Sequence, residues 1–239
     1  MPEVAKECLI AFLGCVEYSR ALDLQFRICE SKKQGFEADM LVLLEHPPTI
    51  TLGRNGKWDN LVVSNEELRT RGVSCYEVDR GGDITFHGPG QLVGYPLLKL
   101  EAGERDVHLF MWKLEESLIR LLDEFGIRSK RVEKLTGVWT AAGKIAALGV
   151  HISRWITRHG FALNVNTNLS YYDLIIPCGI AGKNVTSMEA LLSRQINLEE
   201  VAERYIPHFG QVYTRQMKRI SELELEERFL SHARKIAVT

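Results

Sequence analysis

Residues 137–166, GVWTAAGKIAALGVHISRWITRHGFALNVN, decide the fold of this chain more than any other stretch. β-Branched and aromatic residues are frequent in it, and Gly143, Gly149 and Gly160 interrupt it. Such residues favour strands, and glycines between strand-forming runs are typical of tight turns or close backbone approaches. We therefore expect a meander of successive strands joined by short turns.

Strand-forming segments also precede this meander. Residues 38–46, ADMLVLLEH, predict a buried strand that two prolines stop, and residues 49–56, TITLGRNG, predict a second strand that runs into a glycine turn. Residues 73–100, VSCYEVDRGGDITFHGPGQLVGYPLLKL, alternate β-formers with glycine pairs and end in an apolar run. That pattern predicts strand, glycine loop and strand.

Helical patterns lie on both sides of the strands. Residues 18–31 suit a helix that ends at Gly35, and Asp106 is a suitable N-cap for an amphipathic helix that runs to Gly126. Three further helix starts follow from capping-box spacing, at Thr186/Glu189, Asn197/Glu200 and Ser221/Glu224. Helices at both ends and between clustered strands indicate an α+β fold, and we expect one catalytic domain over 1–239 that includes the helical segment 197–239.

Composition excludes several function classes. Thirty lysines and arginines against thirty-one acidic residues give a net charge of -1, so we expect neither nucleic acid nor a membrane as a partner. The five cysteines lack C-x-x-C spacing, and the seven histidines show no metal-binding spacing. We therefore expect no disulfide framework and no metal site. The scattered cysteines fit the reducing cytoplasm, and the acidic residues near Met1 argue against a transit peptide. We also expect a monomer.

Two glycine-containing segments resemble nucleotide motifs without matching them. Residues 80–91, RGGDITFHGPGQ, lack the G-x-G-x-x-G spacing and open a strand instead of a helix. Lys144 follows Gly143 as in a phosphate-binding loop, but Val138 and Ile145 stand where glycine and a hydroxyl residue are required. Neither segment predicts a nucleotide site.

Cys178 is the cysteine with the most suggestive surroundings. It lies in residues 173–187, DLIIPCGIAGKNVTS, after a proline and before Gly179 and Gly182, with a predicted helix downstream. An isolated cysteine is more often inert packing than a nucleophile, but an open turn before a helix can direct backbone N–H groups at the sulfur. The residues alone leave packing and catalysis open.

A nucleophilic thiol needs a partner that takes its proton. The candidates are His87, His151, His159 and Lys144, although a lone lysine on a sheet more often lies along it with its head in water. The surroundings of Cys178 do not match a cysteine protease. The remaining histidines, His46, His108, His208 and His232, are expected at the surface or at helix caps.

Four segments together resemble the octanoyltransferases, the lipoyl(octanoyl) transferases of the lipoate-protein ligase B family. They are LEHPPTITLGR, RGGDITFHGPGQLVGYPLL, GVWTAAGKIAALGVHISRWITRHGFALNVN and IIPCGIAGKNVTSMEAL, in order from residue 44 to 192. The resemblance implies a mixed β-sheet flanked by helices, of the biotin- and lipoate-protein ligase catalytic-domain type.

The resemblance also implies site residues. Cys178 would be the acyl-accepting nucleophile and Lys144 the residue that activates it. The acyl-binding surface would comprise Arg80, Gly81, Gly82, Asp83, Ile84, Thr85, Phe86 and His87, then Ala147, Leu148 and Gly149, and then Gly160, Phe161 and Ala162.

The implied reaction needs two protein partners and no bound cofactor. Octanoyl would arrive on the phosphopantetheine of acyl carrier protein and leave on a lysine of a lipoyl domain of a 2-oxoacid dehydrogenase complex or of the glycine cleavage H protein. Because the donor is acidic, we expect a basic rim of Arg80, Lys144, Arg154 and Arg158 at the site. Three alternatives are an ATP-dependent lipoate- or biotin-protein ligase, a related transferase that takes another donor, and a non-catalytic acyl-binding module.

Overall fold

A mixed β-sheet of eight strands forms the centre of the computed structural model, which describes residues 5–176 and 184–236. The strand order is β11-β1-β2-β6-β10-β9-β8-β7. β1 pairs in parallel with β2 and β11, and the other neighbours are antiparallel. The strands are β1 (Lys6–Cys15), β2 (Asp39–Glu45), β6 (Gln91–Leu97), β7 (Lys130–Val132), β8 (Leu135–Thr140), β9 (Gly143–Ser153), β10 (Ile156–Asn164) and β11 (Arg215–Arg219).

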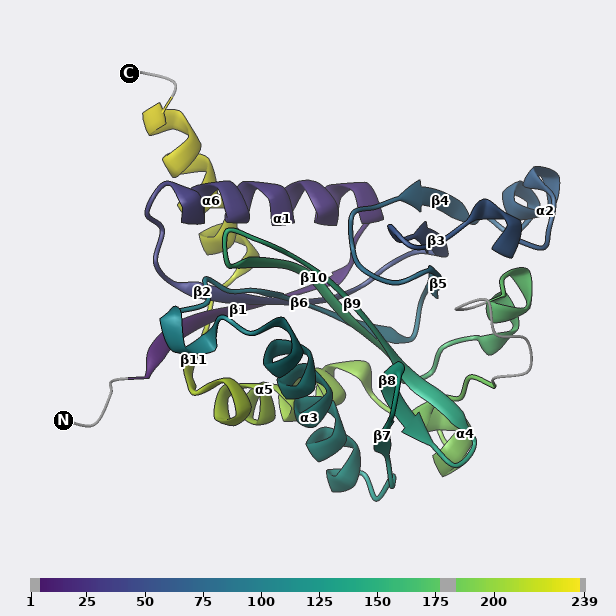
Figure 1. The fold of residues 1–239 in the computed structure, drawn as a ribbon. Helices are drawn as coiled ribbons and strands as arrows, with labels where there is room; N and C mark the ends of the chain where they lie inside the picture. Colours follow the sequence, from purple (N-terminus) through teal and green to yellow (C-terminus); the bar gives the residue numbers. More distant parts are fainter. Residues whose placement is uncertain (1–4, 177–183, 237–239) are drawn as a thin grey trace.

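Helices cover both faces of this sheet. α1 and α6 lie on one face, and α3 and α5 lie on the other (Figure 1). The helices are α1 (Tyr18–Lys33), α2 (Asn65–Thr70), α3 (Val107–Glu124), α4 (Met188–Leu192), α5 (Leu198–Tyr213) and α6 (Glu222–Ile236). Among the described residues, no helix is long and apolar enough to span a membrane. The α+β class expected from the sequence is confirmed.

β2 shows why its sequence is a continuous apolar run. Successive residues of a strand point to opposite faces of the sheet. Met40 and Val42 therefore join the core beneath α1, whereas Leu41 and Leu43 join the core beneath α3 and α5. Both faces of β2 are buried from Met40 to Leu44, so each of these positions is hydrophobic.

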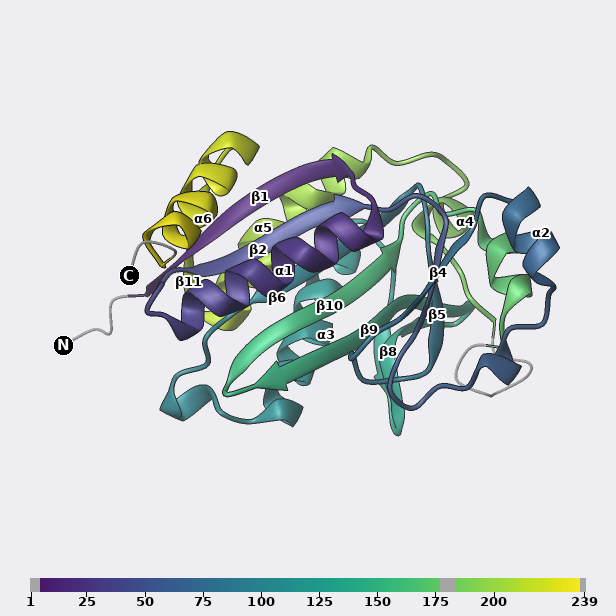
Figure 2. The same ribbon diagram turned by 90° about the horizontal axis from the view of Figure 1, so that it is seen from above.

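A second sheet of three strands lies on the α1 side, beside one end of the main sheet (Figures 1 and 2). Its order is β4-β3-β5, with β3 (Thr49–Leu52) paired in parallel with β4 (Ser74–Glu77) and antiparallel with β5 (Ile84–His87). The glycine-rich segment thus contains the loop before β5 and then leads into β6. The sequence predicted two strands over 73–100, and the structure has three.

The predicted meander is confirmed as β8, β9 and β10. Arg154 and Trp155 connect β9 to β10 with φ values of 52° and 61°. Two consecutive residues with positive φ make the tight turn that matches the twist of antiparallel strands. This hairpin aligns Ala147 with Ala162 and Gly149 with Gly160.

Three of the four predicted N-caps are confirmed. Asp106 accepts hydrogen bonds from the backbone N–H groups of His108 and Leu109, Asn197 caps α5, and Ser221 forms the expected reciprocal bonds with Glu224. The start at Thr186 is wrong by one residue.

Ser187 caps α4 instead, because the chain before it is still extended. The Thr186 N–H donates to the Lys144 carbonyl, and the Lys144 N–H donates to the Asn184 carbonyl, both at 2.9 Å.

Two strands at the parallel side of the main sheet, β1 and β11, were not expected from the sequence.

Candidate active site

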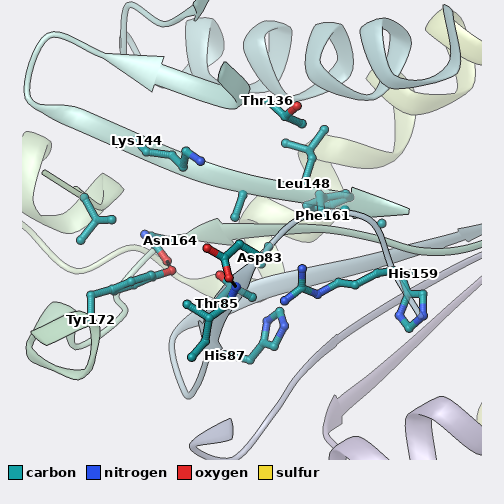
Figure 3. A pocket seen from close by; sticks show the side chains of 18 of the residues that line it. Asp83, Thr85, His87, Thr136, Lys144, Leu148, His159, Phe161, Asn164 and Tyr172 are labelled. Atoms are coloured by element: carbon teal, nitrogen blue, oxygen red, sulfur yellow. Dashed lines mark hydrogen bonds between the residues drawn. The ribbon is translucent and has the colours of Figure 1, made fainter. Parts of the chain in front are cut away.

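A cavity of about 320 Å³ lies between the main sheet and the glycine-rich segment of the small sheet. β9 and β10 supply one wall, and the loop before β5 together with β5 itself supplies another (Figure 3). The lining residues are Tyr18, Arg80, Gly82, Asp83, Ile84, Thr85, His87, Tyr95, Lys134, Leu135, Thr136, Trp139, Lys144, Ala147, Leu148, Gly149, His159, Gly160, Phe161, Ala162, Asn164, Tyr172, Asn184 and Val185.

Most of the predicted acyl-binding residues line this cavity. Gly81 and Phe86 are the two that do not. Phe86 points away from the cavity and stacks on Tyr171 with 4.7 Å between ring centroids, because it alternates along β5 with Thr85 and His87. The Gly81 N–H donates to the Val150 carbonyl at 2.9 Å and fastens the glycine loop to β9.

Lys144 lies on the cavity wall near the start of β9. Its Nζ is 4.8 Å from the centroid of the Trp139 ring on β8, a cation–π distance. Gly137 makes room for the lysine stem, since a Cβ there would lie 3.2 Å from the Lys144 Cε. Trp139 and Gly137 therefore fix the direction of the Lys144 side chain.

Cys178 lies outside the described residues, which stop at Ile176 and resume at Asn184. The Ile176 N–H donates to the Asn60 carbonyl at 2.8 Å. Asn184 is joined to Lys144 by the backbone bond given above, and a Cβ on Gly143 would lie 2.3 Å from the Asn184 carbonyl oxygen. Glycine at 143, where φ is 141°, is what allows residue 184 to approach β9.

His87 is buried in the cavity wall. Its Nδ1 lies 3.0 Å from the Gln91 Oε1, and its Nε2 lies 3.4 Å from the Thr51 Oγ1. Burial lowers the pKa of His87 well below its ordinary value, and the nearby His46 and Arg80 act in the same direction.

Arg80 and Arg158 are buried, so the expected basic rim is wrong at both positions. The Arg80 guanidinium donates to the Thr51 carbonyl at 2.8 Å and ties the glycine loop to β3. Arg158 forms an ion pair with Asp79 and does not line the cavity. Arg154 is exposed in the β9–β10 turn, also away from the cavity lining. Lys134, which no sequence pattern singled out, lines the cavity from the β7–β8 turn.

Asp79 contacts the other two candidate histidines, His151 and His159. Its carboxylate accepts from His159 Nε2 at 2.8 Å and lies 3.4 Å from His151 Nδ1. The hydrogen bond from His159 and the charge of Arg158 hold the pKa of Asp79 well below its ordinary value. Of these three groups, only His159 lines the cavity.

His46 corrects the expectation of a surface histidine. It is fully buried between β2 and α1, with Nδ1 2.6 Å from the Val16 carbonyl oxygen and Nε2 2.7 Å from the Tyr95 hydroxyl. Burial lowers the pKa of His46 to about 4. The Tyr18 ring lies beside the His46 ring with 5.0 Å between their centroids and a tilt of 55°. Tyr18 and Tyr95 both line the cavity. No local pattern in the sequence marks these tyrosines, because α1 and β6 bring them together only in the fold.

The fold is that of the lipoate-protein ligase catalytic domains. The bipartite lipoate protein ligase of Thermoplasma acidophilum, solved together with its E2 lipoyl domain, superposes with a TM-score of 0.74 at 15% identity, over 94% of this chain and 90% of that one. At this identity the likeness concerns the fold alone.

Sequence similarity gives the family. The lipoyl protein ligase A/B catalytic domain matches residues 17–210. The octanoyltransferase of Solibacter usitatus is 50% identical over 89% of this chain and 96% of its own length. The octanoyltransferase of Caldicellulosiruptor saccharolyticus is 47% identical over 91% of this chain and 94% of its own. This chain belongs to the lipoyl protein ligase A/B family and, within it, to the octanoyltransferases, which transfer octanoyl groups for protein lipoylation.

Proposed function

We propose that this chain moves an octanoyl group from acyl carrier protein to a lysine of a lipoyl domain, or of the glycine cleavage H protein, through a thioester on Cys178. The position of Lys144 carries the proposal. This lysine lies on the wall of a cavity whose other walls are mostly the segments expected to bind the acyl chain. The four described cysteines are free thiols, which supports a reducing, cytoplasmic setting.

The cavity suits a short saturated chain. Its walls near Lys144 include Ala147, Leu148, Phe161 and Ala162, and each methylene buried there contributes about 0.8 kcal/mol. The octanoyl chain would extend from Lys144 along the paired strands β9 and β10. Gly149 and Gly160, opposite one another in the register, lie farther along the same path.

The first transfer exchanges one thioester for another. Lys144, in its neutral form, takes the proton of the Cys178 thiol, and the thiolate attacks the carbonyl carbon of the octanoyl thioester. The carbon–sulfur bond to phosphopantetheine breaks, and the departing sulfur takes the proton back from Lys144. The Trp139 ring holds the ammonium form of Lys144 at the cavity wall through the cation–π contact.

The second transfer forms an amide. The lysine amine of the acceptor attacks the octanoyl-Cys178 carbonyl carbon, the bond to Cys178 breaks, and the thiol is restored. Thioester exchange is nearly neutral in free energy and the amide product is more stable, so the proposed route uses no ATP.

The test is the intact mass of the enzyme after incubation with octanoyl carrier protein. We expect wild-type enzyme to gain one octanoyl group and Cys178→Ser to gain none. Cys75→Ser is the matched control, because Cys75 is exposed and lies away from the cavity lining. An octanoyl adduct that survives Cys178→Ser, or no adduct on the wild type, would refute the mechanism.

Lys144→Arg tests the proton transfer in the same assay. Arginine keeps the charge but cannot act as a neutral base, so the acylation rate should fall by about 10²–10⁴-fold. An unchanged rate would remove Lys144 from this role and turn attention to the histidines of the cavity.

A further inference from the structure

Asp83 is the one carboxylate among the described residues that line the cavity. It follows the glycine pair of the loop, where Gly82 has a φ of 90°, and precedes β5. Figure 3 shows Asp83 and Lys144 on the walls of the same cavity. An acyl chain is neutral and apolar, so its binding does not require a carboxylate, and a negative charge in an apolar cavity is unfavourable without a partner.

Three neighbouring residues fix the position of the Asp83 carboxylate. Its Oδ1 accepts from the Ile84 N–H at 2.7 Å, and its Oδ2 accepts from the Asn60 side-chain amide at 2.8 Å. Gly56 leaves room for the carboxylate, since a Cβ there would lie 2.6 Å from the Asp83 Oδ1. Both donors are neutral, so they orient the carboxylate without neutralising its charge.

We propose that Asp83 binds the ammonium group of the acceptor lysine and presents it to the octanoyl-enzyme. The inference rests on the proposed function, in which a lysine side chain must enter a site that already holds the acyl group. A lysine arrives as a cation, and a partly buried carboxylate is the side chain that attracts and orients such a cation. The glycine loop thereby selects the second substrate as well as the acyl chain.

The chemistry of the step is balanced without further reactants. The bond between the lysine nitrogen and the octanoyl carbonyl carbon forms, and the bond between that carbon and Cys178 breaks with its electron pair going to sulfur. The ammonium group loses two protons in all. One goes to the Cys178 thiolate through Lys144, and the other goes to solvent. Asp83 holds the nitrogen during these transfers and emerges unchanged.

The experiment measures acylation of the enzyme and transfer to the lipoyl domain separately in the variant Asp83→Asn. This substitution removes the charge but keeps an acceptor oxygen for the Ile84 N–H. Acylation by octanoyl carrier protein is measured first for each variant and gives the reference against which transfer is compared. Transfer from the acyl-enzyme to a lipoyl domain should fall by roughly tenfold or more. Asn60→Ala is the control, because it removes a support of Asp83 while keeping the charge, and it should impair transfer less.

Hydroxylamine distinguishes cation binding from a general fault of the loop. It is a neutral amine at neutral pH, so it should release octanoyl from acylated Asp83→Asn as fast as from wild type. Equal slowing with hydroxylamine and lipoyl domain, a loss of acylation as large as the loss of transfer, or unchanged transfer to the lipoyl domain would each overturn the assignment. If wild-type enzyme forms no octanoyl adduct at all, the proposed function fails instead, and this outcome is visible before any variant is compared.

Discussion

Replacing Ala147 with leucine should shorten the acyl chain that the enzyme prefers. Ala147 lies on β9 opposite Ala162 of β10, and both residues line the cavity. Their side chains share the face of the sheet that carries α1, because paired strand residues point the same way and Ala162 belongs to the core on that side. Leucine adds about three carbon atoms to this wall, which occupy the space of about three methylenes of the ligand.

The expected loss of binding free energy follows from the apolar burial that the octanoyl chain would lose. Three methylenes at about 0.8 kcal/mol each amount to about 2.4 kcal/mol. This free energy corresponds to about a 50-fold lower kcat/KM for octanoyl carrier protein. A carrier-bound acyl chain about three carbons shorter would not need the lost space, so its kcat/KM should stay near the wild-type value.

The assay measures kcat/KM for a series of carrier-bound acyl chains with wild-type enzyme and Ala147→Leu. Ala142→Leu is the matched control, because Ala142 is exposed in the β8–β9 turn and does not line the cavity. Equal losses for short and long chains would mean that the substitution damages the site as a whole. An unchanged preference for octanoyl would show that the chain does not pass Ala147, and either result would refute the reasoning.

Two further predictions concern the support of the site. Gly143→Ala should lower both stability and transfer, because the new Cβ would lie 2.3 Å from the Asn184 carbonyl oxygen. Two backbone hydrogen bonds of about 1 kcal/mol each join this region to Lys144. Gly72→Ala is the control for backbone strain, since Gly72 has a positive φ and open space around it, and equal melting temperatures for the two variants would contradict the contact. His46 should make stability depend on pH between its unfolded pKa of about 6.5 and its folded pKa of about 4. Because the folded pKa is the lower one, this contribution is complete above pH 6.5 and is lost as the pH falls toward 4, by about 3 kcal/mol in total. Urea unfolding of wild type and His46→Phe across this range should show the slope only in wild type, and parallel profiles would refute the assignment.

Much of the local structure follows from the sequence. Asp106 and Asn197 begin helices because their side chains accept backbone N–H groups, and that preference acts over two or three residues. The meander is also local, since each of its strands pairs with the next one along the chain. The family is likewise indicated by the residues alone, through the resemblance of four segments to octanoyltransferases.

The tertiary structure alone decides which distant segments meet. β1 lies between β2 and β11, and its pairing with β11 joins residues about 209 positions apart in the sequence, for example Lys6 with Arg215. Strand pairing at such distances depends on the whole sheet, and no short pattern specifies it. For the same reason the sequence selected Phe86 for the site although the pleat turns it away, and it did not select Trp139, which contacts Lys144. The sequence by itself determined the local elements and the residues capable of the chemistry. Only the packing of β9 and β10 against the small sheet decided which of these residues share one cavity. The reason is that a cavity is formed by contacts between segments that are far apart along the chain.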